Sequence, residues 1–149
     1  MTGIRLKLIF CLLALPVLLA MPGATSAQQI PNPVIYLKST EPYDQNGKKF
    51  VKYHYTVYNQ SAFPAAMFAA APDLPPCGMN TKSSRTWVDL YDQKGKRIWG
   101  FCAFSKPADL EDVWFALEAG ATPPSWIYIE LTDRKTNTKY KSNLAETSN

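Results

Sequence analysis

The stretch SWIYIELTD, residues 125–133, alternates aliphatic side chains with aromatic and polar ones at a period of two. Successive side chains of an extended strand point to opposite faces. Ile127, Ile129 and Leu131 therefore fall on one face, opposite Trp126 and Tyr128. The segment WVDLY, residues 87–91, repeats this pattern. Both segments are predicted to be strands that cover a hydrophobic core with one face.

Several further runs are short, rich in β-branched and aromatic residues, and separated by Gly, Pro, Asn and Asp. They are PVIYLKS (33–39), KFVKYHYTVYNQ (49–60), SRTWVDLYD (84–92), KRIWGFCAF (96–104) and DVWFAL (112–117). This pattern is typical of an all-β domain. In layout it resembles the immunoglobulin and fibronectin type III class, which implies an antiparallel β-sandwich of about seven strands. The cysteine spacing differs from that of antibody domains, so the resemblance covers the architecture alone.

Two segments predict β-hairpins, YDQKGKRIW (91–99) and TDRKTNTKY (132–140), because Gly95 and Asn137 can adopt a positive φ. The strand from Ile98 to Phe104 is apolar on both faces apart from its glycine. Strands that are buried on both faces read as continuous apolar runs. We therefore expect this strand to lie centrally in a sheet.

The connection SAFPAAMFAAAPDLPP, residues 61–76, departs from alternation. Its alanines favour helix, but its prolines limit any helix to about two turns. We expect one short irregular or helical crossover at the sandwich edge, held by Phe63 and Phe68 and fixed at Cys77. The segment KPADLEDVWF (106–115) is expected to open with a single helical turn.

Residues 1–27 have the composition of a secretory signal peptide, because Arg5 and Lys7 precede the apolar run LIFCLLALPVLLAM and small residues follow it. The run is shorter than the roughly 20 apolar residues that span a bilayer. We expect cleavage before Gln28, no retained transmembrane helix, and a mature protein that is periplasmic or secreted.

Residues 28–149 are long enough for one domain with its own core, and the ends at 28–33 and 142–149 are expected to be flexible. The chain has 16 basic and 12 acidic residues. The leader contains two of the basic residues, so the mature net charge is 14 minus 12, or +2. No dense basic stripe is present, which argues against nucleic-acid binding.

Removal of the leader also leaves two of the three cysteines, Cys77 and Cys102. A cysteine pair in an exported protein usually forms a disulfide. Two alternatives stay open, namely a redox-active pair, for which the sequence has no CxxC spacing, and metal ligation.

Catalytic groups are scarce. His54 is the only histidine and lies on the polar face of its predicted strand, without a GxSxG motif or a second histidine. A hydrolase could instead use paired carboxylates. The candidate acids are Asp89, Glu111, Asp112, Glu130 and Asp133. Each has an ordinary structural role available, so we expect a protein that is not an enzyme and has no cofactor.

Two weaker motifs remain. Met67, Met79 and His54 could form a soft-metal site, although methionine more often fills core space. Asn59-Gln60-Ser61 matches the glycosylation acceptor pattern, which matters only in a host with that machinery.

Aromatic residues are the enriched class. Trp87, Tyr91, Trp126 and Tyr128 lie opposite the aliphatic faces of their strands and could form one outward surface. The alternative is that a second layer, such as the alanine-rich crossover, covers them. Exposed rings offer large apolar area at low entropic cost. We therefore expect a binding module for a protein or, second, a glycan; a small hydrolase and an envelope metal-binding protein are the alternatives.

Overall fold

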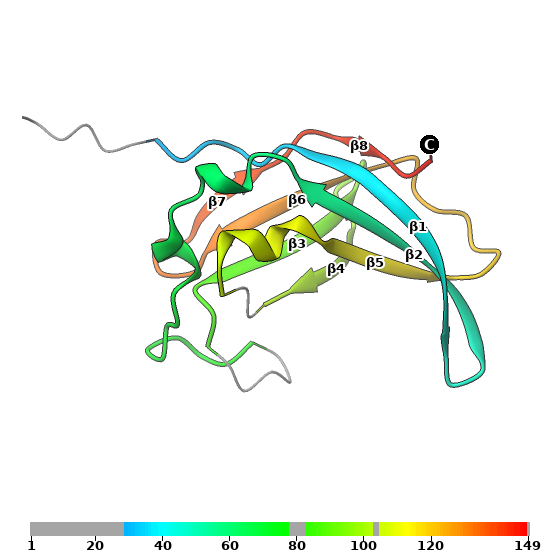
Figure 1. The fold of residues 1–149 in the computed structure, drawn as a ribbon, viewed down its shortest axis with the longest axis horizontal. Helices are drawn as coiled ribbons and strands as arrows, with labels where there is room; N and C mark the ends of the chain where they lie inside the picture. The colour runs from blue at the N-terminus through cyan, green and yellow to red at the C-terminus, as the bar shows by residue number, and fades with distance from the viewer. Residues whose placement is uncertain (1–28, 78–82, 103–104, 149) are drawn as a thin grey trace, which may run out of the picture.

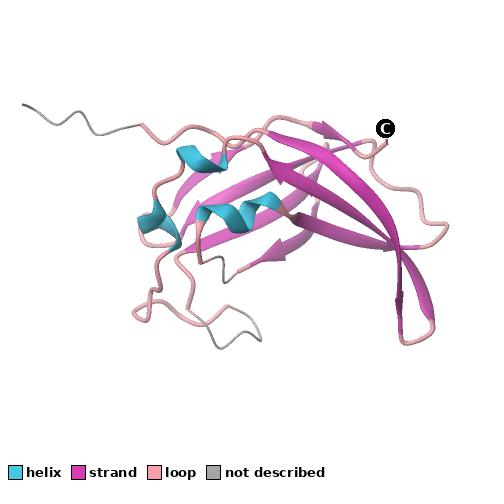
Figure 2. Cartoon of the chain, in the orientation of Figure 1, coloured by secondary structure: helices cyan, strands magenta, loops and turns pink. Residues whose placement is uncertain are grey.

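The computed structural model describes residues 29–77, 83–102 and 105–148, and its regular structure is almost entirely β (Figures 1 and 2). The strands are β1 (Ile35–Gln45), β2 (Lys48–Val57), β3 (Thr86–Asp92), β4 (Arg97–Phe101), β5 (Val113–Glu118), β6 (Trp126–Asp133), β7 (Thr138–Lys141) and β8 (Ala145–Glu146). They form two antiparallel sheets, as expected for a sandwich-like all-β fold. No helix among the described residues is long and apolar enough to cross a membrane.

One sheet has the strand order β1-β2-β5, and the other has the order β4-β3-β6-β7. The short strand β8 also pairs with β6, where Ile127 lies opposite Ala145. Strands β7 and β8 therefore form one interrupted edge strand along β6, with the break at residues 142–144.

The core lies between the two inner faces. Ile127, Ile129 and Leu131 are fully buried, and so are Val88 and Leu90 of the neighbouring strand β3. The predicted alternation is thus confirmed for both segments. From the opposite sheet, the ring of Phe115 stacks on that of Tyr53 at 5.0 Å between centroids and lies 6.1 Å from that of Tyr55.

Two turn predictions are confirmed, because Gly95 and Asn137 have φ angles of 82° and 55°. A third tight turn joins β1 to β2 through Asn46 and Gly47, with φ angles of 55° and 78°. Positive φ at both central residues defines the two-residue hairpin turn that matches the strand twist.

The prediction that the strand 98–104 is central is wrong. Strand β4 ends at Phe101 and lies at the edge of its sheet, paired only with β3; residues 103–104 lie outside the described residues. Its apolar character has another cause. Trp99 and Phe101 lie opposite Leu90 and Val88 in register, and both contact the ring of Trp114 in the other sheet. These rings close one open side of the sandwich.

The connection from 61 onward crosses one end of the sandwich in two short 3₁₀ turns, η1 (Gln60–Ala62) and η2 (Ala65–Phe68). Phe63 and Phe68 are buried in the core, as predicted, together with Met67. The Thr86 hydroxyl donates to the Met67 carbonyl and ties η2 to the start of β3. A third turn, η3 (Pro107–Glu111), precedes β5 and matches the predicted helical turn.

Both expected flexible ends make ordered contacts where they are described. Asn143 donates from its amide to the Ile35 carbonyl at 3.0 Å and accepts from the Ile35 N–H at 2.8 Å. The residues from 142 to 148 thus carry β8 and a link between the two sheets. In the N-terminal segment, Ile30 packs against the core and Pro33 is buried.

The core assignment predicts a contrast between two leucines. Leu90 is fully buried and Leu144 is 50% exposed. Leu90→Ala removes buried methyl groups and leaves a cavity, so it should lower the free energy of unfolding by about 3 kcal/mol. Leu144→Ala, the same chemical change at the surface, should lower it by less than about 1 kcal/mol. Urea denaturation measures both, and equal losses would contradict the assignment.

Candidate binding surfaces

The outer face of the β4-β3-β6-β7 sheet carries Trp87, Tyr91 and Tyr128, and the fourth predicted ring residue, Trp126, lies at the end of this face. Tyr91 and Tyr128 are cross-strand partners whose rings stack at 5.1 Å between centroids. Lys141 places its Nζ 4.0 Å from the centroid of the Tyr128 ring, and the Arg97 guanidinium lies 5.7 Å from that of Trp87. Cations over ring faces are weakly stabilising. All three rings are half-buried.

Ion pairs fill the space between these rings. Asp89 and Glu130 are opposite each other on β3 and β6. Asp89 accepts from Arg97 Nε at 2.5 Å, and Glu130 accepts from Lys139 Nζ at 2.7 Å. Burial, and then the Asp89 charge, raise the pKa of the Tyr91 phenol. The hydrogen bond from Lys139 to Glu130 raises the pKa of the Lys139 ammonium. Each carboxylate has its own cation.

The alanine-rich crossover does not cover this ring pair. Its large side chains, Phe63, Met67 and Phe68, are buried in the core. The expected second layer therefore forms no lid on Tyr91 and Tyr128, which remain partly accessible.

Trp126 lies at the end of the same strand face, beside β8, and is 40% exposed. It lines a groove of about 370 Å³ together with Tyr36 and Leu144. This groove runs along the side of the sandwich where β1 meets β8.

Exposed apolar side chains line this groove and continue to the adjoining start of β1 and end of β2. Among the described residues, six large apolar side chains are exposed. Five of them are Val34 (45%), Tyr36 (50%), Tyr58 (75%), Trp126 (40%) and Leu144 (50%), here called the apolar corner. Tyr58 donates its backbone N–H to the Val34 carbonyl at 2.7 Å, so these two residues are cross-strand neighbours. The sixth, Trp99, lies on the opposite edge of the sandwich. Large contiguous apolar surface on a soluble domain often marks an interaction site.

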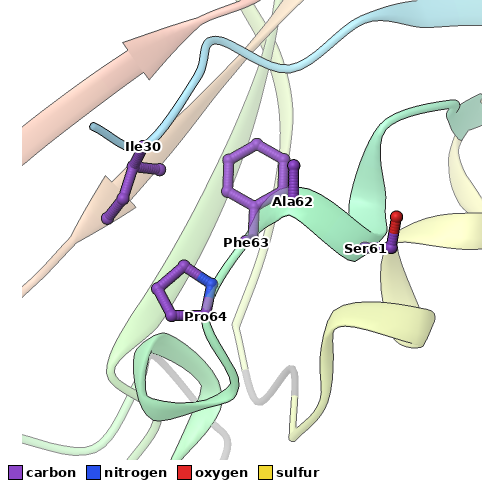
Figure 3. Close-up of a pocket in the computed structure, with 5 residues that line it drawn as sticks. All are labelled: Ile30, Ser61, Ala62, Phe63 and Pro64. Carbon is purple, nitrogen blue, oxygen red and sulfur yellow. The ribbon is translucent and has the colours of Figure 1, made fainter. Parts of the chain in front are cut away.

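A smaller pocket of about 250 Å³ lies between the N-terminal segment and the crossover. Figure 3 shows Ile30 facing Phe63 and Pro64 across it. Its lining contains no titratable side chain, and its volume is below the 300–1,000 Å³ typical of small-molecule sites. We assign it to packing of the N-terminal segment.

His54 lies on the outer face of the β1-β2-β5 sheet, on the polar side of its strand as predicted, but its side chain is only 14% exposed. Its Nδ1 is 2.7 Å from Asp112 Oδ1, and its Nε2 is 3.2 Å from Glu41 Oε1. The Nε2 contact lacks hydrogen-bond geometry, which leaves that nitrogen as a buried atom without a hydrogen-bond partner. The neighbouring Lys52 packs between the rings of Tyr43 and Trp114. These contacts join β1, β2 and the start of β5.

Four of the five candidate acids pair with a lysine or arginine, and the fifth, Asp112, contacts His54. In addition to Asp89, Glu130 and Asp112, Glu111 lies 3.8 Å from Lys38 Nζ, and Asp133 binds Arg85. Asp89 and Glu130 are the one pair brought opposite each other, but they lie on an open sheet face. Neither lines the grooves and pockets described above.

The soft-metal candidates are not brought together. Met67 is buried between the sheets, whereas His54 lies on an outer face, and Met79 lies outside the described residues. Within residues 29–77, 83–102 and 105–148, no group of three or more His, Cys, Asp and Glu could hold a metal ion.

The Asn59 side chain forms two hydrogen bonds with the segment that precedes β1. Its Oδ1 accepts from the Val34 N–H at 2.8 Å, and its Nδ2 donates to the Asn32 carbonyl at 2.9 Å. A glycan on Nδ2 would compete with the second of these hydrogen bonds.

Cys77 and Cys102 lie next to each other but are not joined by a disulfide in the structure. Cys102 Sγ is 3.6 Å from the Cys77 carbonyl oxygen. Cys77 is buried, and its sulfur accepts from Arg134 Nη1 at 3.0 Å. The same guanidinium donates to the carbonyls of Ser84 and Pro75. Arg134 thus holds both ends of the segment that contains Cys77, and the disulfide stays a prediction.

Comparison of the chain with protein-family models, with curated proteins and with solved structures finds no match.

The disulfide prediction is tested by mass. After export, the protein should be two hydrogens lighter than its reduced form, because Cys102 Sγ lies next to the Cys77 backbone and a cysteine pair in an oxidising compartment usually forms a disulfide. Closing this loop should raise the free energy of unfolding by roughly 3.5 kcal/mol relative to Cys77→Ser/Cys102→Ser. Two titratable thiols in unreduced exported protein would contradict the prediction.

The ion pair between the buried Asp133 and the partly exposed Arg85 generates a pH prediction. Asp133 is 4% exposed and accepts from Arg85 Nη2 at 2.7 Å and from Arg85 Nε at 2.8 Å. These hydrogen bonds hold the pKa of the Asp133 carboxyl below its usual value. The resulting stability is present above the unfolded-state pKa of about 3.9 and is lost as the pH falls through the folded-state pKa.

Asp133→Asn should therefore cost about 3 kcal/mol at pH 7. The difference from the unmodified protein should shrink as the pH is lowered from 5 to 2, measured by urea denaturation at each pH. A difference that does not change with pH would contradict the role of the ion pair.

Proposed function

We propose that this protein is an exported, non-enzymatic binding module whose apolar corner recognises a protein partner. The observation that carries the proposal is the gathering of Val34, Tyr36, Tyr58, Trp126 and Leu144 at one side of the sandwich. Export rests on the predicted leader, which lies outside the described residues. The pairing of Asp89, Glu111, Glu130 and Asp133 with lysine or arginine supports a function without catalysis.

The chemistry of the apolar corner favours a protein over a sugar. Tyrosine and tryptophan bury large area with few rotatable bonds, and such residues dominate the energetics of protein interfaces. The groove between Tyr36, Trp126 and Leu144 gives a partner side chain a place to insert. Asn143 and Glu146 at its border supply polar groups, as at the rim of protein interfaces.

We further propose that the sandwich belongs to the immunoglobulin and fibronectin type III class. In that class, the first, second and fifth strands share one sheet, and the third, sixth and seventh share the other, with an added strand beside the third in some members. The orders β1-β2-β5 and β4-β3-β6-β7 agree with this partition, since β4 pairs with β3. This support concerns topology and carries no function.

A glycan is the second candidate ligand, favoured by the stacked pair of Tyr91 and Tyr128 on the uncovered outer face. Sugar rings stack on flat aromatic surfaces, and Asp89, Glu130 and Arg97 would supply hydrogen-bonding groups beside them.

The test is capture of a partner from native envelope extract by the immobilised mature protein. Tyr36→Ser/Leu144→Ser should abolish capture of any protein retained by the unmodified form, because it removes the exposed apolar area at the groove. Both positions are 50% exposed, so the free energy of unfolding should change by less than about 1 kcal/mol.

Trp99→Ser is the control, because Trp99 is 46% exposed but lies outside the apolar corner; its free energy of unfolding is measured too, since Trp99 also contacts Trp114. It should retain capture. Equal capture by the double variant and the unmodified protein would contradict the proposal. Loss in Tyr91→Ala/Tyr128→Ala together with retention in Tyr36→Ser/Leu144→Ser would favour the outer face and the glycan candidate.

A further inference from the structure

A cleft of about 460 Å³ lies between the β3–β4 hairpin and the loop that precedes β6. The hairpin contributes residues 92–94 and 96–98, β5 contributes Leu117, and the loop contributes residues 122–124. This volume is within the 300–1,000 Å³ range of small-molecule sites. The lining shares no residue with the apolar corner.

Hydrogen bonds hold the hairpin wall of this cleft in place. Asp92 Oδ1 accepts from the backbone N–H groups of Lys94 and Lys96 at 2.9 and 2.8 Å. Gln93 donates its backbone N–H to the Trp126 carbonyl at 3.0 Å. The cleft wall is therefore preorganised, and the Asp92 carboxylate is used within the turn.

The cleft presents two available positive charges. Within the part of the chain that the structure describes, neither Lys94 nor Lys96 forms an ion pair. Arg97 also lines the cleft, but its guanidinium pairs with Asp89 and lies over Trp87 on the outer sheet face. The ammonium groups of Lys94 and Lys96 are thus the cations of the cleft that can bind an anion.

The rest of the lining is largely apolar. Ile98, Leu117, Pro123 and Pro124 provide it, and proline has no backbone N–H to satisfy. Thr122 adds one hydroxyl. An apolar lining with a few charged groups at one wall fits a ligand that has an apolar part and a charged end.

We propose that this cleft binds a small amphiphilic anion, a carboxylate joined to an apolar chain. The carboxylate pairs with Lys94 and Lys96, and the chain packs on Leu117 and the two prolines. This site goes beyond the protein-binding corner, because it uses other residues and another ligand class.

The test is a titration of the purified protein with octanoate, below its micelle concentration, followed by backbone amide NMR shifts. Octanoate should bind at least tenfold more tightly than octanamide, which has the same chain without the charge. It should also bind more than about tenfold more tightly than acetate, because several methylene groups leave water. Shifts should centre on residues 93–98 and 117–122.

Lys94→Gln/Lys96→Gln should weaken octanoate binding by about tenfold and leave octanamide unchanged. Lys49→Gln/Lys106→Gln is the matched control, because it removes two other exposed lysines outside the cleft. Octanoate binding should survive in it. Equal weakening in both variants, or acetate binding as tight as that of octanoate, would overturn the proposal.

A further binding experiment distinguishes a free ligand from a lipid surface that presents the same chemistry. Binding to phosphatidylglycerol vesicles that is lost in Lys94→Gln/Lys96→Gln, without binding of octanoate, would overturn the small-ligand site and identify a membrane contact instead. Binding of octanoate without binding of the vesicles supports the cleft.

Discussion

The burial of one face of each sheet against the other is the constraint on which the structure depends. Five aliphatic side chains of β3 and β6 are removed from water against Tyr53, Tyr55 and Phe115. Because side chains alternate along a strand, a register shift of one residue would turn this whole set outward. The same alternation fixes Tyr91 and Tyr128 on the outer face. The accessible surfaces of the protein are therefore consequences of how its core is closed.

The two open sides of the sandwich are closed by different chemistry. On the side of β4 and β5, Trp99 and Phe101 contact Trp114 and seal the edge with rings. On the side of β1 and β8, the closing element is the Asn143 amide, which binds the Ile35 backbone. An amide satisfies the backbone of an edge strand but covers little apolar surface. The side chains around it remain exposed, and the apolar corner arises there.

Local pattern predicted much of this fold. Alternation identified the inner faces of β3 and β6, and Gly95 and Asn137 marked two turns correctly. The Asn46-Gly47 pair is an equally strong hairpin signal and would have predicted the turn between β1 and β2. These features depend on residues a few positions apart, so the sequence displays them directly.

Features set by pairing between distant segments were not predictable in this way. The apolar run of β4 resembled a central strand because its rings seal an edge, which only the strand order reveals. Tyr36 was not identified as exposed, since its exposure follows from the edge position of β1. His54 was expected at the surface, but Glu41 and Asp112 reach it from neighbouring segments and bury it.

Hydroxyl-radical footprinting of the exported protein, with and without native envelope extract, tests the central claim most directly. It reads the solvent access of each ring in the intact chain without any substitution. Extract should protect Tyr36, Tyr58 and Trp126 and leave Trp99, on the opposite edge, at its original rate of oxidation. Unchanged oxidation of the three corner rings, or protection confined to Trp99, would contradict the account.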